Sequence, residues 1–92
     1  MSPDDELLKL WARVERELQA ASALVVIDPA TRRLFDDFLA HNELGLAFQA
    51  LVRALVDSPA TPPSDARTHL EAAAAEMELQ DDPDWRRLTE RA

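Results

Sequence analysis

The sequence predicts an all-α protein, a compact bundle of four main helices followed by a short C-terminal helix. Alanine and leucine dominate the chain, glycine occurs once and tyrosine never, and β-branched residues are few outside Val25-Val26-Ile27. Such a composition favours helix over strand. Apolar residues also recur at three- and four-residue steps between helix-start signals. With 92 residues, the chain is expected to form a single helical domain, residues 1–92, around one core.

The first two helices are predicted from a repeated start signal. Ser2-Pro3 and Asp28-Pro29 each place a capping side chain before a proline at the first helical position. The first helix is expected to end near Ala23, and residues 24–27 to form a buried connector. The second is expected to end at His41-Asn42, because asparagine tolerates the left-handed conformation that closes a helix. The residues expected to face inward are Leu7, Leu10, Trp11, Val14, Leu18 and Ala21 in the first helix, and Leu34, Phe35, Phe38 and Leu39 in the second.

A third helix, from Glu43 to about Val56, is predicted to be the central one because it is apolar nearly all round. Its main stripe consists of Leu44, Ala47, Phe48, Leu51 and Leu55. Leu46 points away from that stripe at about 100° per residue, so either the fourth helix or another molecule must cover it. Both alternatives are open from the sequence, and the second makes Leu46 a candidate contact.

Two further helices follow a proline-rich loop over residues 57–63, which no helix can cross. Ser64 is expected to cap the fourth helix, and Asp82-Pro83 to start the short fifth one. The inward face of the fourth helix is expected to be Ala66, Leu70, Ala73, Ala74 and Met77. Trp11 and Trp85 could serve as interface anchors, but both lie on apolar helix faces, so we expect them in the core.

The chain has a net charge of −8, from 18 acidic and 10 basic residues. This charge limits the kinds of partner that it can bind. Such a field repels a phosphate backbone or an anionic lipid surface, so neither nucleic acid nor a membrane is expected as a direct ligand. The same field speeds encounter with a basic protein. No apolar run approaches the roughly 18–20 residues that cross a bilayer, and no export signal pattern is found. A cytoplasmic location is therefore expected.

Six acidic residues lie close together with no lysine or arginine among them, and a second stretch without these bases contains Asp36, Asp37 and Glu43. The first lies between Glu71 and Asp84, and the second runs from Leu34 to Val52. If both face the same side, they form one acidic surface. The alternative is that both are solvated helix faces that complement helix dipoles. The absence of interleaved cations favours an interaction surface, because a purely solubilising surface usually mixes signs.

No residue pattern points to catalysis, to a cofactor or to a metal. Cysteine is absent, lysine occurs once, and no glycine-rich phosphate loop is present. Asp37 and His41, four residues apart with Glu43 nearby, are a weak metal candidate, short of the ligand set that a site usually offers. A surface hydrogen bond at His41 is the alternative. We therefore expect a non-enzymatic protein without cofactor or metal.

The segment from Phe38 to Leu51 resembles a signature of small bacterial immunity proteins of the MafI type. In that pattern a helix ends in a short turn, a glutamate opens the next helix, and a Leu-Ala step leads into a leucine-rich stretch. The element order agrees across residues 34–80, and Asn42 stands where the family often has glycine. The resemblance implies a cytoplasmic antitoxin that binds and blocks a cognate toxin domain, often a nuclease.

The sequence thus favours an immunity protein that neutralises a toxin by stoichiometric binding through an acidic surface. A toxin that binds nucleic acid needs a positive groove, which suits an acidic inhibitor. The residues expected to contact it are Asp36, Asp37, Leu46, Glu76, Glu78, Asp81, Asp82 and Asp84. The alternative is a small helical homodimer or adaptor module, in which self-association covers the apolar side chains of the third helix that its own chain leaves exposed.

Overall fold

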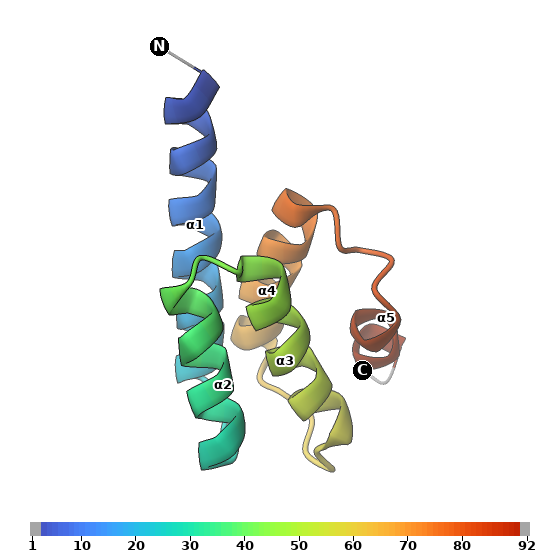
Figure 1. Ribbon diagram of the computed structural model, residues 1–92. Coiled ribbons are helices and arrows are strands. Elements are labelled where there is room, and N and C mark those ends of the chain that lie inside the picture. The colour runs from blue at the N-terminus through green and yellow to red at the C-terminus, as the bar shows by residue number, and fades with distance from the viewer. Residues whose placement is uncertain (1–2, 91–92) are drawn as a thin grey trace.

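Five helices make up the regular structure of residues 3–90, the part of the chain that the computed structural model describes. They are α1 (Pro3–Ala23), α2 (Pro29–Ala40), α3 (Leu44–Asp57), α4 (Ser64–Met77) and α5 (Pro83–Glu90) (Figure 1). The all-α class, with four main helices and a short C-terminal one, is confirmed. None of the helices in this range combines the length and apolarity needed to cross a membrane.

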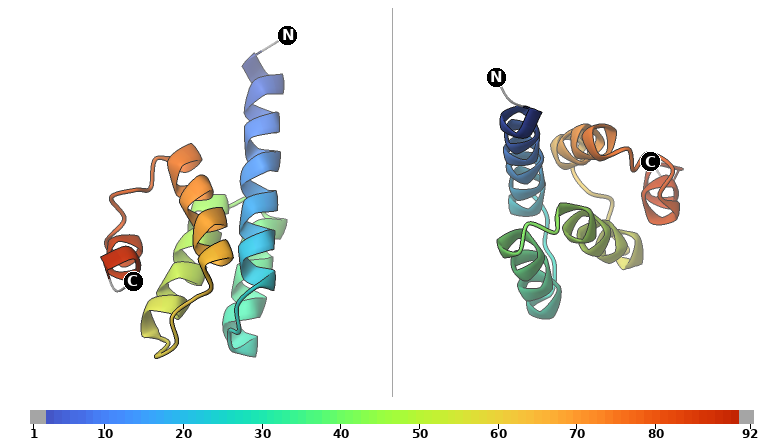
Figure 2. Two further views of the ribbon diagram at one scale, coloured as in Figure 1. Left: turned by 180° about the vertical axis from the view of Figure 1, so that it is seen from behind. Right: turned by 45° about the horizontal axis from the view of Figure 1, so that its top comes forward.

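Helix α3 is the centre of the bundle, as its apolar character predicts. It contacts each of the other four helices. Helices α1 and α4 pack side by side and antiparallel, whereas α2 and α5 lie on different sides of α3 (Figures 1 and 2). The fully buried large side chains are Phe35, Phe48, Leu18, Leu51, Leu70, Leu88, Val14 and Val52. They join all five helices in one core.

Helix starts follow the predicted signals with one exception. Asp28 caps α2: the Thr31 hydroxyl (2.7 Å) and then the Thr31 backbone N–H (2.9 Å) donate to its carboxylate and hold its pKa below the usual range. Asp82 caps α5, because its Oδ1 accepts from the backbone N–H groups of Asp84 and Trp85, both at 3.1 Å. Ser64 is not the cap of α4: Pro63 takes that position, without a side-chain hydrogen bond. The expected cap Ser2 lies outside the described residues.

The apolar face of α1 is only half covered, which corrects the sequence-based expectation. Val14, Leu18 and Ala21 are buried, but Leu7 and Trp11 are 42% and 38% exposed. Helix α1 has 21 residues and α4 only 14, so α1 projects past the end of α4 and past the turn between α2 and α3 (Figure 1). No helix of the described chain lies opposite its first turns.

Three other apolar residues expected inside, one on α2 and two in the connector, are exposed. Leu34 on α2 is 48% exposed. In the connector, Val25 and Ile27 pack against the core while Leu24 and Val26 point outward, with Val26 96% exposed. Residues 24–27 therefore bury only two of their four apolar side chains.

Candidate functional site

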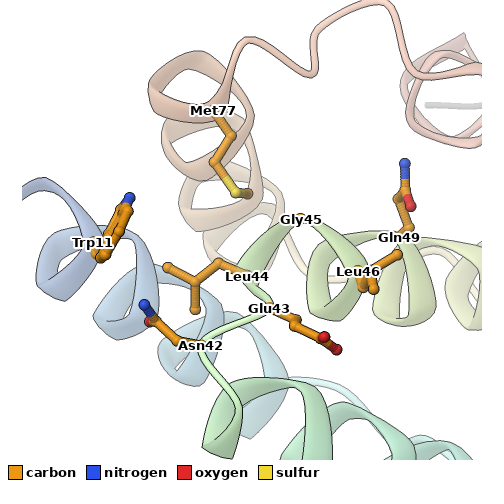
Figure 3. Close-up of a pocket in the computed structure, with 8 residues that line it drawn as sticks. All are labelled: Trp11, Asn42, Glu43, Leu44, Gly45, Leu46, Gln49 and Met77. Carbon is orange, nitrogen blue, oxygen red and sulfur yellow. The ribbon is translucent and has the colours of Figure 1, made fainter. Parts of the chain in front are cut away.

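An open pocket lies where the start of α3 meets α1 and the end of α4. Its volume is about 460 Å³. Its lining consists of Trp11, Asn42, Glu43, Leu44, Gly45, Leu46, Gln49 and Met77 (Figure 3). The lining is mainly apolar with a few polar groups, the character of a surface that binds another molecule.

Two left-handed residues create the opening by ending helices early. Asn42 (φ 57°) closes α2, and the Glu43 N–H donates to the Phe38 carbonyl at 2.8 Å. Glu78 (φ 58°) closes α4 in the same way, with the Leu79 N–H donating to the Ala74 carbonyl at 2.8 Å. Both hydrogen bonds are of the kind that terminates a helix with a left-handed residue. Because α2 and α4 stop at these points, Trp11 keeps an uncovered face.

The floor of the pocket is Gly45, the only glycine in the chain. It lies in the first turn of α3, and no glycine of the described residues has a positive φ. A Cβ atom built at this position meets nothing within 4 Å. Apart from the adjacent residues Leu44 and Leu46 and the backbone of α3 itself, no atom of the described chain therefore lies close to this position.

Carboxylates border the apolar lining. Glu43 takes the N-cap position of α3 but makes no capping hydrogen bond, so its side chain stays exposed. Glu78 is exposed next to the pocket residue Met77. Neither forms an ion pair within residues 3–90. Glu76 differs, because Arg13 of α1 lies 3.7 Å from its carboxylate.

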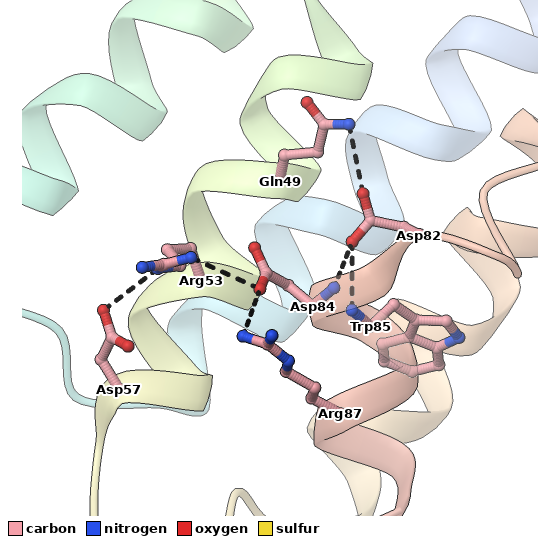
Figure 4. Close-up of polar contacts among 7 residues, drawn as sticks. All are labelled: Gln49, Arg53, Asp57, Asp82, Asp84, Trp85 and Arg87. Carbon is pink, nitrogen blue, oxygen red and sulfur yellow. Dashed lines mark hydrogen bonds and ion pairs between the residues drawn. The ribbon is translucent and has the colours of Figure 1, made fainter.

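The acidic stretch around α5 is partly neutralised by arginines, one from α5 itself and others from α1 and α3. Asp84 is 3.6 Å from Arg53 and 3.9 Å from Arg87 (Figure 4). Asp82 caps α5 and also accepts a hydrogen bond from Gln49 at 3.2 Å. No cation lies among these acids in the sequence, but the expectation that none lies among them in the folded chain is wrong, because Arg13 lies beside Glu76 and Arg53 beside Asp84. Sequence distance concealed Arg13 and Arg53, which reach the cluster from other helices.

The acids of α2 lie apart from those of α5. Asp36 and Asp37 are exposed on α2, and Asp81 is exposed between α4 and α5. Helix α3 separates α2 from α5 (Figure 2). None of the acids expected to contact a partner lines the pocket, although Asp82 accepts a hydrogen bond from the lining residue Gln49 and Glu78 follows the lining residue Met77.

Leu46 is 46% exposed and lines the pocket, so α4 does not cover it. Its expected separation from the main stripe of α3 is confirmed. Trp11 is the pocket residue that sequence reasoning misassigned, because its helical face predicted a core position. Sequence reasoning also missed Gly45 and Met77. A lone glycine inside a predicted apolar helix was the available signal.

The two histidines take part in local hydrogen bonds. His41 Nδ1 lies 2.8 Å from the Asp37 carbonyl oxygen, which is the surface hydrogen bond offered as the alternative to a metal ligand. His69 Nδ1 lies 2.7 Å from Glu17 Oε2 and joins α4 to α1. No three His, Asp or Glu side chains of residues 3–90 converge as a metal-ligand set.

Comparison of the chain with protein-family models, with curated protein sequences and with solved structures yields no match. The resemblance of residues 34–80 to immunity proteins therefore stays a prediction. The feature of this chain best suited to binding another molecule is the pocket at the start of α3.

Proposed function

We propose that this chain is an immunity protein that neutralises a cognate bacterial toxin in the cytoplasm by stoichiometric binding. The observation that carries the proposal is the open apolar pocket between α1, α3 and α4, which Glu43 lines and whose residue Met77 is followed by the exposed Glu78. This arrangement suits recognition of a protein whose surface is basic and carries an apolar projection. The resemblance around Phe38 to Leu51 supports an inhibitory outcome of that binding.

Apolar contact area supports a protein partner. Trp11 and Leu46 expose substantial surface on the rim of one pocket. Aromatic and aliphatic side chains at the centre of an interface carry most of its binding free energy, because their burial removes apolar area from water. In the free chain this apolar area contacts water, so binding of a partner removes it from water and stabilises the complex.

Charge supports a basic partner. The chain carries −8, and complementary potentials raise association rates by several orders of magnitude at low salt. Asp36, Asp37 and Asp81 contribute to the long-range field from outside the pocket. Asp82, Asp84 and Glu76 have structural partners, so their replacement affects the fold as well as binding. A toxin with a nucleic-acid groove carries the required positive surface.

The test uses the product of the reading frame next to this gene. Titration calorimetry of the purified pair is expected to give 1:1 binding, and co-expression to abolish that product's toxicity. Leu46→Glu is expected to weaken binding at least tenfold. Leu34→Glu is a matched control, because Leu34 is similarly exposed on α2 and does not line the pocket.

Absence of binding, with toxicity undiminished, would overturn the proposal of toxin neutralisation. Equal binding by the wild type, Leu46→Glu and Leu34→Glu would show that the partner uses another surface. Urea unfolding of both variants checks that each substitution leaves the fold intact, as expected for positions that are nearly half exposed.

A second candidate, a homodimeric module, is favoured by one observation. Leu7 and Leu8 are 42% and 58% exposed on the projecting part of α1, and self-association would cover them. Sedimentation velocity at several concentrations separates the two candidates. A dimer that Leu8→Glu converts to a monomer would support the module, and a monomer at all concentrations supports the antitoxin.

A further inference from the structure

Gly45 has no structural reason to be glycine in the described chain. It lies inside a helix, where glycine is among the weakest helix formers. Its backbone does not require a positive φ, and a Cβ atom would meet nothing within 4 Å. The missing side chain therefore relieves no clash and no backbone strain within residues 3–90. What glycine does provide is close access to the backbone of α3.

The residues that line the pocket at Gly45 determine which kind of side chain can bind in it. Trp11, Leu46 and Met77 form apolar walls on three sides, and Figure 3 shows their side chains around the start of α3. The pocket volume of about 460 Å³ lies in the range of ligand-binding clefts. A large apolar side chain would contact all three walls and the bare helix backbone at Gly45.

The carboxylates near the pocket determine which charged groups of a partner can lie beside it. Glu43 lines the pocket and Glu78 follows Met77, and neither has an ion-pair partner within residues 3–90. Partly desolvated carboxylates at an interface bind best to cations that reach them directly, and arginine can do so with two hydrogen bonds.

We propose that the pocket over Gly45 receives one large apolar side chain from a basic segment of the partner, whose neighbouring lysines or arginines pair with Glu43 and Glu78. This inference rests on the proposed function and names the chemistry by which the partner is recognised. Gly45 is then the contact point, since any side chain there would occupy the space that the partner's side chain fills.

A second copy of this chain fits the pocket poorly. Its exposed apolar residues Leu7 and Leu8 follow the acidic run Asp4-Asp5-Glu6. Docking of that segment would bring three carboxylates towards Glu43 and Glu78, with Lys9 as the one adjacent base. Like charges at close range oppose such an interface, so the occupant is a basic segment rather than another protomer.

The first test is an NMR titration of the labelled full chain with the basic peptide Lys-Arg-Lys-Phe-Lys-Arg-Lys. One control peptide has alanine in place of phenylalanine, and the other has glutamate in place of every lysine and arginine. The chain supplies its own reporters: the single glycine amide, the Trp11 indole at the pocket and the buried Trp85 indole.

The phenylalanine peptide is expected to shift the Gly45 amide and the Trp11 indole saturably, and to leave the Trp85 indole in place. The alanine peptide should bind at least tenfold more weakly, and the glutamate peptide should cause no shift. Equal shifts with the phenylalanine and alanine peptides, or shifts that avoid Gly45, would overturn the inference. Because these controls change only the peptide, they do not depend on the folding of any variant.

The second test fills the pocket from within by Gly45→Phe, with Ala30→Phe as the matched control on the exposed first turn of α2. Circular dichroism and thermal melting verify that both variants fold. Gly45→Phe is expected to weaken binding of the phenylalanine peptide at least tenfold, and Ala30→Phe to change it less than twofold. Equal affinities for both variants would contradict the inference.

The same variants separate this inference from the proposed function. If the wild type and Gly45→Phe neutralise the toxin equally well, the inference fails and the antitoxin proposal stands. If the phenylalanine peptide binds over Gly45 but the chain neutralises no toxin, the antitoxin proposal fails and the recognition chemistry stands.

Discussion

The two tryptophans of this protein lie on similar apolar helix faces and have opposite environments. Trp85 is 6% exposed and packs on Phe48, with ring centroids 5.8 Å apart, because α5 lies across α3. Trp11 is 38% exposed and lines the open pocket together with Met77, the last residue of α4, and Asn42, which follows α2. The comparison teaches that apolar periodicity identifies the face of a helix that can be buried. The length of the opposing helix decides whether it is buried.

The polar groups at the two ends of α3 differ in the same way. Beside α5, Asp84 lies near Arg53 and Arg87. At the start of α3, Glu43 makes neither a capping hydrogen bond nor an ion pair within the described range. One end of α3 is closed by its own chain, and the other end presents apolar and acidic groups to a partner.

The largest expected effect separates the two tryptophans by stability. Trp85→Ala should lower the free energy of unfolding by about 3–5 kcal/mol, because it removes a large buried side chain from the core. Trp11→Ala should lower it by less than about 1 kcal/mol, since the outer face of Trp11 already contacts water. Urea unfolding followed by circular dichroism measures both values. Equal losses would mean that Trp11 belongs to the core after all.

A smaller effect is expected at the end of α4. Glu78 has a left-handed backbone (φ 58°), which costs a residue with a Cβ atom about 1 kcal/mol relative to glycine. Glu78→Gly should therefore stabilise the fold by about that amount and slow association with a basic partner about two- to threefold at low salt. Thermal melting and stopped-flow binding check the two parts. A destabilised variant, or one with an unchanged association rate, would contradict the assignment.

A smaller stabilisation is expected at the floor of the pocket. Gly45→Ala adds a methyl group in open space and reduces the conformational entropy of the unfolded chain, so it should raise the free energy of unfolding by about 0.5 kcal/mol. Denaturant unfolding at neutral pH measures the difference. A loss of stability would show that the space above α3 is not open.

The last expected effect depends on pH and concerns Asp28, the N-cap of α2. Its pKa is lowered by the Thr31 hydroxyl and backbone hydrogen bonds, so the ionised carboxylate stabilises the folded state at neutral pH. That contribution is lost as the pH falls below the usual value of 3.8 and through the lowered folded-state value. Asp28→Ala should melt below the wild type at pH 7, with the gap closing in acid. A gap independent of pH would refute the capping role.

The sequence predicted the helices well because each boundary has a local chemical cause. Asp28, Asn42 and Asp82 all act at the helix ends where their side chains predict caps or left-handed closure. The pocket could be predicted only in part. Leu46 was identified from its angle on α3, but the exposure of Trp11 depends on where α4 ends in space. The partners of Asp84 depend on packing between α3 and α5, which no local pattern records.

The central claim is that the open end of α3 is the partner-binding surface. The most direct measurement is ¹⁹F NMR of the chain labelled with 5-fluorotryptophan, which gives one signal for Trp11 and one for Trp85, assigned with Trp11→Phe. On saturation with the toxin partner, the Trp11 signal is expected to shift and to lose its sensitivity to exchange of H₂O for D₂O, while the Trp85 signal stays in place. A saturated complex in which Trp11 keeps its free-state signal would contradict the claim.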